Sequence, residues 1–550
     1  MINRQQAKKI GLILGPILFV VVLFSPIAQD LPWEARIVLA LTFWMGSWWI
    51  TEAIPIYVTA LLPVVIFPSL NVTDLGETSA NYADRIVFLF LGGFILAKAV
   101  EKSNLHRRFA LNMLKIFGTN PKYIVASFMM VTGFLSGWMS NTATTMLMLP
   151  IAAAVISQFQ NKQDKDKFGL CLMLSVAYSA SIGGMSTLIG TPPNAILASL
   201  SSSLADVEVT FGEWLIVGLP ISAISLVVAW LYMVNIGVNI RGIKPVAEEK
   251  GIIGKKLSEL GRITGDEILV AGIFAATATA WITRGLLWQD LLPMVDDSTI
   301  AIAAAISLFL IPSISSNRNR HIKGNNRDDI EHTRDKKRRR GGGGGSSSPN
   351  HKEADEEDDN NNNNNNRRQD LNQSNGGENE IGKTRNVNNG SKRLMDWKTA
   401  VTIPWGVIIL IGGGLALANA YTETGLDEWI AERLVFLQGI NYLVVIFVIV
   451  AVAIFVGEIV SNTASAALLI PISASLAVSL GIDPLLLMIP LTIATSFGFV
   501  MPVGTPPNAI VFASGYVTIP KMARAGLPLD IIGIVLVTIL TTLLVPLIWS

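Results

Sequence analysis

Two similar stretches, MSNTATTMLMLPI at residues 139–151 and VSNTASAALLIPI at residues 460–472, decide the fold of this chain. Each places Ser-Asn-Thr inside apolar sequence, where a buried polar side chain costs free energy unless it is hydrogen-bonded or binds a polar partner. The copies lie 321 residues apart, and the same offset relates three further pairs: Gly92 with Gly413, Gly93 with Gly414, and Pro150 with Pro471. The sequence therefore predicts an internal duplication.

A second motif follows each of these stretches. GTPPNAI stands at residues 190–196 and again at 504–510. Proline lacks an amide hydrogen and clashes with the preceding turn, so each proline pair must interrupt a helix, and the threonine before it is driven out of the helical conformation. A second half-helix can begin at the prolines, because proline suits the first position of a helix. We therefore predict two discontinuous spans, at 170–203 and 484–515.

The composition indicates a membrane protein. Of 550 residues, 51% are hydrophobic, and the mean hydropathy is +0.49. A helix of roughly 20 apolar residues crosses a hydrocarbon core of about 30 Å, and long apolar runs recur along the chain. We expect an all-α polytopic fold with uninterrupted crossings near 10–28, 35–51, 53–70, 86–102, 213–238, 264–286, 298–312, 401–420 and 527–549.

The apolar sequence around each Ser-Asn-Thr favours a re-entrant hairpin over a pair of crossings. In the first copy, the segments 123–138 and 143–158 are each too short to span the bilayer comfortably, and the polar triplet separates them. Irregular backbone at membrane depth is tolerated only where it is buried in protein or lines a cavity. We therefore predict two helical hairpins, at 123–158 and 443–479, with their polar tips inside the protein.

One region differs from the rest in composition. Residues 313–396 include KKRRR, runs of glycine and serine, an acidic stretch and seven consecutive asparagines. Such a sequence buries too little apolar surface to offset the entropy of ordering, so we predict a disordered cytoplasmic insert between membrane regions at 1–312 and 397–550. Its basic run could suggest binding to nucleic acid or acidic lipid, but we interpret it as a solvated linker and expect no nucleic-acid partner.

The order of spans and the charge of the loops predict the orientation. An odd number of spans separates the helix near residue 86 from its repeat near residue 401, so the two halves should be inverted. With the N terminus in the cytoplasm, INRQQAKK, HRRFALNMLK and the basic insert all lie inside, and the acidic loops NVTDLGETSANYAD and TETGLDEW lie outside, as the positive-inside rule requires. We expect a plasma-membrane protein whose N terminus and insert are cytoplasmic and whose C terminus is outside.

Inverted repeats, broken helices and paired hairpins are typical of a secondary transporter with its binding site near the bilayer midplane. The four motif segments carry hydroxyl, amide and backbone oxygens, which suit a hard cation such as Na⁺, and no charged side chain. The N-terminal ends of the interrupted helices add positive dipole ends that favour an anion. Bound Na⁺ would supply a removable charge and so couple sodium to substrate affinity. The sequence thus predicts symport of Na⁺ with an anion.

The chain resembles the divalent anion:sodium symporter family, which includes sodium-coupled dicarboxylate and citrate transporters. The resemblance rests on both Ser-Asn-Thr motifs, both TPPNA segments and WWITEAIPIYVTALLP at residues 48–63, and it covers nearly everything except the insert. It implies a homodimer in the lipid bilayer, protomers with about eleven transmembrane helices and two re-entrant hairpins, and elevator-type alternating access. The implied cargo is a small di- or tricarboxylate, such as succinate, malate, fumarate or citrate, together with Na⁺ at two or more sites.

The resemblance also implies which residues bind the cargo. Ligands for Na⁺ would come from two clusters: Ser136, Ser140, Asn141 and Gly190 in the first half, and Ser461, Asn462 and Gly504 in the second. Substrate carboxylates would meet a set of amide and hydroxyl groups: Asn141, Thr142, Thr191, Asn462, Thr463 and Thr505. The internal alignment places Gly457 opposite Ser136, so the second cluster lacks one hydroxyl and must find another oxygen.

An acidic residue leaves other mechanisms open. Glu458 lies three residues before the second Ser-Asn-Thr, and an intramembrane carboxylate is a functional candidate by default. It could serve a proton-coupled or sodium-independent dicarboxylate exchanger, although we favour a structural carboxylate that accepts hydrogen bonds from the hairpin backbone. A sulfate symporter is a further alternative, because sulfate also offers two negative charges to neutral oxygens.

The sequence argues against an enzyme and against a passive channel. Three of the four histidines lie in the insert, Cys171 is the only cysteine, and neither HExxH nor GxxxxGK[ST] is present. The sequence therefore lacks the usual motifs of zinc peptidases and of ATP-driven pumps. A passive channel would not explain two hairpins. We expect a transporter without enzymatic activity.

Overall fold

The computed structural model describes residues 4–115, 120–244, 249–314, 393–502 and 504–549. All regular secondary structure in these residues is helical. The chain divides into a membrane unit, which comprises Met1–Ile311 and Arg393–Ser550, and a second unit, Pro312–Lys392. Most of the predicted insert, 315–392, lies outside the described residues. The chain is an all-α polytopic membrane protein.

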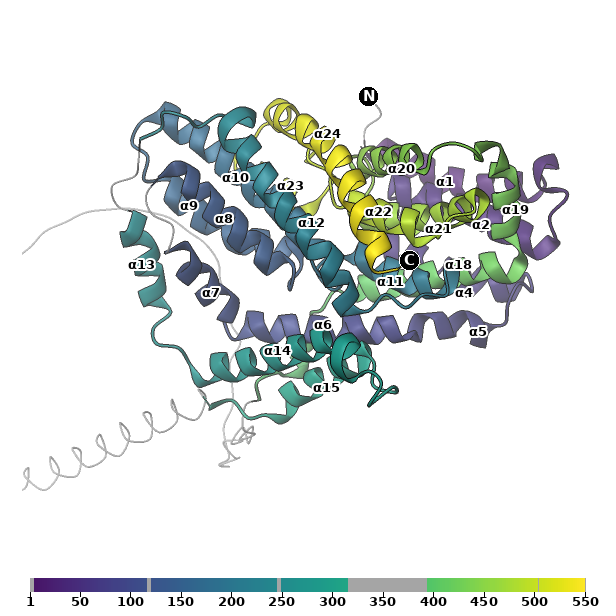
Figure 1. The fold of residues 1–550 in the computed structure, drawn as a ribbon, viewed down its shortest axis with the longest axis horizontal. Helices are drawn as coiled ribbons and strands as arrows, with labels where there is room; N and C mark the ends of the chain where they lie inside the picture. Colours follow the sequence, from purple (N-terminus) through teal and green to yellow (C-terminus); the bar gives the residue numbers. More distant parts are fainter. Residues whose placement is uncertain (1–3, 116–119, 245–248, 315–392, 503, 550) are drawn as a thin grey trace, which may run out of the picture. The chain divides into compact units, whose positions relative to one another are not determined.

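The chain begins with α1 (Arg4–Leu23) and α2 (Trp33–Thr51), which pack side by side (Figure 1). A β-carbon at Gly15 would lie 2.5 Å from atoms of the Trp44 and Trp48 rings, so glycine at this position allows the close approach of the two helices. Five further helices follow: α3 (Ile56–Thr59), α4 (Leu62–Ser69), α5 (Leu75–Ala80), α6 (Arg85–Lys102) and α7 (Leu105–Leu114).

Each half of the duplication then contributes two helices that meet at Ser-Asn-Thr, a helix broken at GTPPN, and a long final helix. In the first half these are α8 (Pro121–Ser136), α9 (Asn141–Ile156), α10 (Lys162–Gly184), α11 (Pro192–Leu204) and α12 (Phe211–Tyr232). In the second half they are α20 (Tyr442–Gly457), α21 (Asn462–Leu480), α22 (Leu485–Ala494), α23 (Pro506–Ala513) and α24 (Ile519–Leu544).

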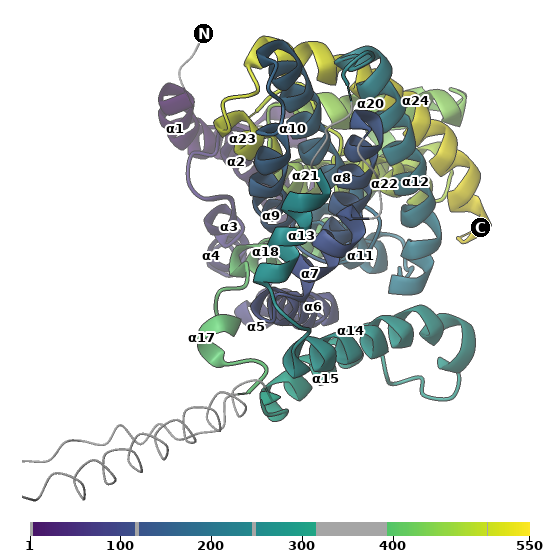
Figure 2. The same ribbon diagram turned by 90° about the vertical axis from the view of Figure 1, so that its left-hand side faces the viewer.

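Other helices lie between these two sets in the chain. They are α13 (Glu249–Glu259), α14 (Gly265–Thr283), α15 (Asp297–Leu310), α17 (Trp397–Ala400), α18 (Trp405–Thr424) and α19 (Leu426–Leu434). Short 3₁₀ helices and two π helices complete the described elements. The 3₁₀ helices are η1 (Pro26–Ala28), η2 (Asn81–Ala83), η5 (Val435–Leu437) and η6 (Val545–Leu547), and the π helices are η3 (Met233–Gly237) and η4 (Arg284–Trp288). Helix α15 packs along α6, as Figure 2 also shows.

Among the described residues, seven helices are long and apolar enough to cross a membrane, or eight if Leu426–Leu437 and Tyr442–Gly457, which meet at a bend of 116°, form one span. Two other predicted crossings, at 53–70 and 298–312, are shorter apolar helices. The crossing predicted at 53–70 is divided between α3 and α4, and α24 begins at Ile519, earlier than the predicted residue 527.

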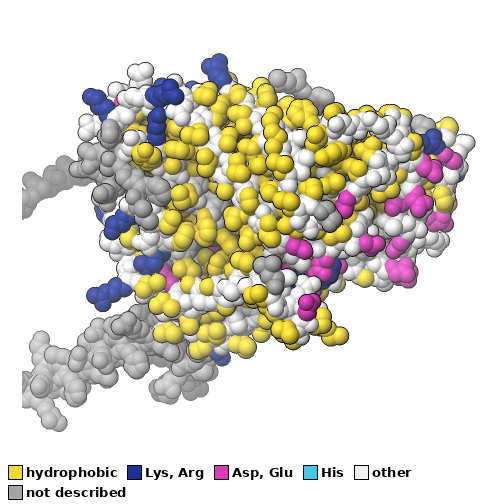
Figure 3. All heavy atoms as spheres, in the orientation of Figure 1, with side chains coloured by type: hydrophobic (Ala, Val, Ile, Leu, Met, Phe, Trp, Pro, Cys, Tyr) yellow, Lys and Arg dark blue, Asp and Glu magenta, His cyan; other side chains and the backbone are white. Residues whose placement is uncertain are grey.

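Apolar side chains cover the middle of the face of the membrane unit in Figure 3, and charged side chains gather at its two ends. Lys and Arg side chains lie at the end where Figure 1 places α7 and α13, and Asp and Glu side chains lie at the end with α5 and α19. An apolar band between two charged ends is the surface expected of a protein whose middle is surrounded by lipid.

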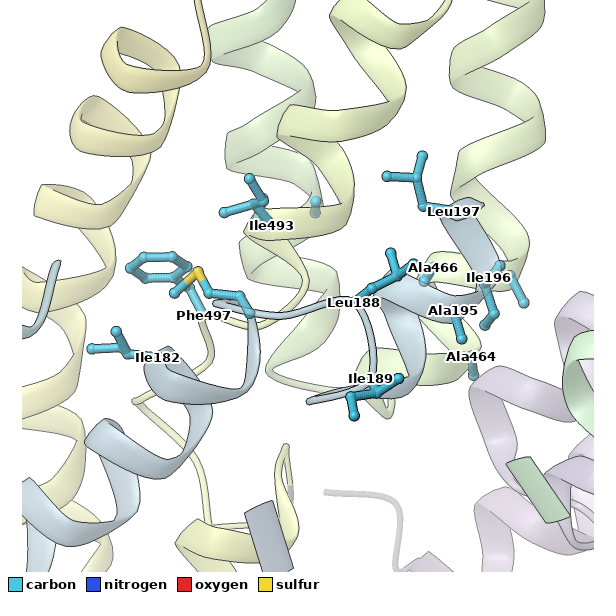
Figure 4. Packing of buried hydrophobic residues seen from close by; sticks show 14 of the residues in the cluster. Ile182, Leu188, Ile189, Ala195, Ile196, Leu197, Ala464, Ala466, Ile493 and Phe497 are labelled. Carbon is cyan, nitrogen blue, oxygen red and sulfur yellow. The ribbon is translucent and has the colours of Figure 1, made fainter. Parts of the chain in front are cut away.

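The two halves pack against each other through their broken helices. In the first half α11 contacts α21 and α22, and in the second half α23 contacts α9 and α10. Figure 4 shows Leu188, from the first break, next to Ala466 of α21. The Tyr178 hydroxyl on α10 donates to the carbonyl oxygen of Phe499 in the second break, at 3.0 Å. Each GTPPN helix therefore lies against the Ser-Asn-Thr helix of the other half.

Hydrogen bonds within the membrane unit join the end of α15 to the segment that begins at Arg393. The backbone amide of Leu394 donates to the Ile311 carbonyl at 3.1 Å, and that of Met395 donates to the Leu308 carbonyl at 3.0 Å. Lys102 on α6 donates to the Asp396 carboxylate at 2.5 Å. Backbone hydrogen bonds thus hold Leu394 and Met395 at the end of α15.

Candidate functional site

The tip between α8 and α9 is closed by a serine cap. Ser140 Oγ accepts a hydrogen bond from the Ala143 amide at 3.2 Å, which satisfies one of the free amides at a helix start. Ser136 Oγ lies 2.6 Å from Asn141 Oδ1 and 2.7 Å from the Ala180 carbonyl oxygen. A hydroxyl has one proton, so three oxygens meet here around a single hydrogen. Three oxygens with only one proton between them form a site that a cation would stabilise.

The first helix break brings backbone oxygens to the same tip. A β-carbon at Gly190 would lie 2.3 Å from the Gly184 carbonyl oxygen and 3.0 Å from that of Gly137. Thr187 Oγ1 donates to the same Gly137 carbonyl, and a β-carbon at Gly184 would lie 2.5 Å from Asn141 Oδ1. Position 190 therefore has no room for a side chain. The structure places Ser136 in contact with Asn141, sets Gly190 against the Gly137 and Gly184 carbonyls of the same tip, and uses Ser140 as the cap beside them. That these residues bind sodium stays a prediction.

The second half repeats this arrangement with a difference. Ser461 Oγ accepts from the amide three residues later at 3.3 Å and caps α21. Asn462 Oδ1 is buried and has no hydrogen-bond donor among the described residues. A β-carbon at Gly504 would lie 3.0 Å from the Gly457 carbonyl oxygen and 3.3 Å from that of Glu458. The second tip thus offers an unpartnered amide oxygen beside two backbone carbonyls.

In the second half, backbone carbonyl oxygens lie near the position that corresponds to the Ser136 hydroxyl of the first half. At Gly457, which aligns with Ser136, a β-carbon would face the carbonyl oxygens of Phe497 and Thr495 at 3.5 and 3.6 Å. The hydroxyl of Ser496, between these two residues, is buried and has no hydrogen-bond partner among the described residues. The missing oxygen that the sequence left open can therefore come from the second break.

Both tips present neutral oxygens, the ligand type that hard cations take from proteins. Within the described parts of the chain, no group of three or more His, Cys, Asp or Glu side chains is placed to hold a metal ion. Burying an acceptor without a donor costs free energy, and both the Asn462 oxygen and the oxygens around Ser136 would gain from a bound cation. The residues present therefore fit Na⁺ as cargo.

The predicted anion-binding threonines lie at the starts of four helices. Thr191 and Thr505 are buried and extended, with φ of −144° and −133°, and each precedes a helix that begins with proline. Thr142 and Thr463 lie in the first turns of α9 and α21 and are partly exposed. Helix starts carry partial positive charge and free amides, so all four positions suit an anion. That Asn141 and Asn462 share one pocket remains a prediction.

Two buried asparagines that the sequence analysis left without a role hold the breaks together. Each donates its side-chain amide to carbonyl oxygens of the loop between the half-helices: Asn194 to Thr187 and Gly184, at 2.8 and 3.4 Å, and Asn508 to Gly498 and Met501, at 2.8 and 3.0 Å. The signal was present in the sequence, because the last residue of GTPPN is the same in both copies.

Glu458 has a structural role, but with a different partner from the one predicted. Its carboxylate oxygens accept hydrogen bonds from the backbone amides of Val500 and Met501, both at 2.8 Å. These donors belong to the second helix break, so the expectation that the hairpin backbone supplies them was wrong. Glu458 therefore joins the second tip to the second break.

Comparison with known proteins agrees with this architecture. The family model described as the sodium:sulfate symporter transmembrane region matches residues 6–549. A protein of Staphylococcus saprophyticus named sodium-dependent dicarboxylate transporter SdcS is 37% identical over 546 residues, which cover 98% of this chain and 91% of the relative. The protein of the same name from Staphylococcus aureus is 36% identical over 548 residues, with the same coverage of both chains.

Proposed function

Since the chain belongs to the divalent anion:sodium symporter family, we propose that it is a sodium-coupled symporter of a divalent anion such as a C4-dicarboxylate. Its relatives of nearly full length are named sodium-dependent dicarboxylate transporters, which supports succinate, malate or fumarate as the substrate class, with citrate as a larger member. Membership of a symporter family also agrees with the expectation that the chain is no enzyme.

The observation that carries the proposal is the set of neutral oxygens at the two tips. Ser136, Asn141 and the carbonyls around Gly190 would hold one Na⁺, and Asn462 with the carbonyls around Gly504 would hold another. Among the described residues, neither tip offers a fixed positive charge to an anion, so the cation itself has to attract the substrate carboxylates. Substrate affinity then depends on sodium, and this coupling free energy is what symport requires.

The substrate would lie between the tips, where hydroxyl and amide groups stand at helix starts. Its carboxylates would accept from Thr142 and Thr463 in the first turns and from Thr191 and Thr505 at the breaks, while Asn141 and Asn462 contact both cation and anion. We further propose a homodimer with elevator-type movement. The basic and acidic ends of the face in Figure 3 support an N terminus and insert in the cytoplasm and a C terminus outside the plasma membrane.

A panel of ions and substrates tests the proposal. Purified protein in proteoliposomes would be given radiolabelled succinate with Na⁺, Li⁺ or K⁺ outside, and unlabelled malate, citrate or sulfate as competitor. The proposal expects saturable uptake with Na⁺, little with K⁺, and competition by dicarboxylates. Uptake that is equal in all three cations would instead favour a sodium-independent exchanger.

Sulfate symport is the second candidate, favoured by the description of the matching family model. The same neutral oxygens and helix starts would accept the oxygens of sulfate. Sodium-dependent uptake of radiolabelled sulfate that excess succinate leaves unchanged would select this candidate over dicarboxylate transport.

A further inference from the structure

We propose that the membrane unit carries a binding site for an anionic phospholipid where α10 and α24 begin. Lys167, Lys521 and Arg524 bind the phosphate of the headgroup, and the acyl chains lie along the exposed apolar faces of α12 and α24. The proposal goes beyond sodium-coupled symport and does not depend on it.

Two adjoining pockets lie at the start of α24. The first has a volume of about 360 Å³ and is lined by Asp166 on α10, Tyr516 between α23 and α24, and Lys521 on α24, among others. The second, of about 350 Å³, shares Asp166 and Lys521 with the first and adds Lys167 and Arg524. Helix α10 belongs to the first half of the duplication and α24 to the second, so the pockets lie at a junction between the halves.

The two pockets carry an excess of positive charge. Lys167, Lys521 and Arg524 are exposed, and none of them has an ion pair or a side-chain hydrogen bond with another described residue. Asp166 is the only acidic side chain among the described lining residues. Three cations with one carboxylate among them suit a phosphate group, whose oxygens accept charge-assisted hydrogen bonds from lysine and arginine.

Two further cations lie close to the second pocket. Lys122 Nζ and Arg241 Nε both donate to Asn235 Oδ1, at 3.0 and 3.2 Å. Asn235 is two residues before Gly237, which lines the second pocket. An amide oxygen is neutral, so these cations also lack a negatively charged partner among the described residues, and the positive field extends beyond the pockets.

Exposed apolar side chains continue from the basic residues along the membrane-spanning helices. Residues three or four positions apart share a helix face, and the exposed face of α24 that begins with Lys521 and Arg524 continues with Leu527, Ile531, Val535 and Ile539. The neighbouring α12 exposes Ile224, Val227 and Leu231.

Both helices lie on the face of the membrane unit in Figure 3, where hydrophobic side chains cover the middle and Lys and Arg side chains lie at one end. A basic pocket at the end of an apolar surface matches a phospholipid, whose charged headgroup is joined to acyl chains. A small soluble anion would make no use of the apolar faces.

The first half of the chain has a pocket at the corresponding position but without the basic residues. Aligning the Gly-Leu-Pro triplet of α12 with that of α24 places Glu213 opposite Lys521, and Ile216 then stands opposite Arg524. Both Glu213 and Ile216 line a pocket of about 550 Å³, which has no lysine or arginine among its described lining residues. The start of such a helix therefore does not require cations, and the basic pair distinguishes the second copy.

Native mass spectrometry of the full-length, delipidated protein tests the proposal. The Kd of the first bound lipid would be measured with phosphatidylglycerol, which is anionic, and with phosphatidylcholine of the same acyl chains, which has no net charge. Phosphatidylglycerol should bind at least about fivefold more tightly, since one basic side chain near an anionic lipid contributes roughly that factor. Equal affinities would overturn the proposal, because they would indicate apolar contact only.

Variants locate the site. The double variant Lys521→Gln, Arg524→Gln should weaken the binding of phosphatidylglycerol by about 25-fold, roughly fivefold for each side chain, and leave that of phosphatidylcholine unchanged. Lys398→Gln is the control, because Lys398 is an exposed lysine of α17 that lines neither pocket. If the double variant fails to fold, Lys167→Gln on α10 should show a loss of about fivefold by itself. Unchanged affinity for phosphatidylglycerol in these variants would overturn the proposal.

Competition with glycerol 3-phosphate distinguishes a lipid from a soluble phosphate. This compound supplies the phosphate without acyl chains, so an excess of 100-fold over phosphatidylglycerol, by about two orders of magnitude, should leave the lipid bound. Displacement of the lipid at that excess would show that the pockets bind a soluble anion, and the assignment to a phospholipid would be wrong.

Discussion

Asn194 and Asn508 occupy the same place in the two halves of the chain. Each side-chain amide donates to two carbonyl oxygens that lie ten and seven residues earlier, and both asparagines are fully buried. The acceptors belong to unwound backbone, whose carbonyls have no partner from a continuing helix. One asparagine in each half therefore fixes the loop that carries Gly190 or Gly504 to its tip.

Replacing either asparagine should loosen this loop. Asn194→Ala or Asn508→Ala leaves two buried carbonyls without a donor, which should lower the free energy of unfolding by about 1–3 kcal/mol, with a lower Tm and a loss of sodium-dependent uptake. Asn161→Ser is the control, because Asn161 is an exposed helix cap that serine can replace. Wild-type Tm and uptake in both alanine variants would contradict the role given to these side chains.

Glycine should be essential where α10 crosses α8. A β-carbon at Gly183 would lie 2.2 Å from the Gly133 carbonyl oxygen, whereas one at Gly414 in α18 would meet nothing within 4 Å. We expect Gly183→Ala to cost about 1–3 kcal/mol through overpacking, and Gly414→Ala to be neutral or to stabilise by up to about 1 kcal/mol through helix propensity. Thermal unfolding of the two variants in the same detergent gives the comparison, and equal Tm values would argue against the close crossing.

Residues 318–390 should be dispensable for transport. The backbone on the two sides of the insert is already joined by the hydrogen bonds from Leu394 to Ile311 and from Met395 to Leu308. A short glycine-serine linker can therefore replace the deleted segment, because these hydrogen bonds hold the flanking residues near each other. Uptake of radiolabelled succinate by the deletion variant should stay close to that of wild type. A deletion variant that is folded but inactive would show that the insert takes part in transport.

The contact between Lys102 and Asp396 predicts a pH dependence. The hydrogen bond from Lys102 lowers the pKa of the Asp396 carboxyl group below its usual value, against the opposing effect of partial burial. A lowered pKa in the folded protein means that stabilisation is present above the unfolded pKa of about 3.9 and is lost as the pH falls through the folded value. Because both side chains are partly exposed, the gain should not exceed about 1 kcal/mol.

Asp396→Asn isolates that contribution, because asparagine keeps the cap of α17. Its Tm should lie slightly below that of wild type at neutral pH, and the gap should close in strongly acidic buffer. A gap that stays constant or widens with acid would contradict the assignment to the Lys102 contact.

Local chemistry made part of this fold predictable from the sequence. Proline fixes the breaks before Pro192 and Pro506, because it cannot continue a helix and forces the residue before it into an extended conformation. The serine of each Ser-Asn-Thr is a good cap, so the starts of α9 and α21 also follow from the motif itself.

Contacts between distant segments were not predictable in this way. The partners of Glu458 lie some forty residues later in the chain, so no local pattern indicates that they meet. The carbonyl oxygens that face Gly457 likewise come from another helix break. The division of the crossing at 53–70, by contrast, falls just before Pro63 at the start of α4, so a local signal for it was present in the sequence.

The central claim is that the Ser-Asn-Thr tips bind sodium and the dianion together, and uptake by two variants tests it most directly. Radiolabelled succinate uptake into proteoliposomes would be measured under an inward Na⁺ gradient for wild type, Asn141→Ala, Asn462→Ala and the control Asn161→Ser, each shown to be folded by its Tm. The account predicts sodium-dependent uptake in wild type and control and none in either alanine variant. Undiminished sodium-dependent uptake in both alanine variants would contradict it.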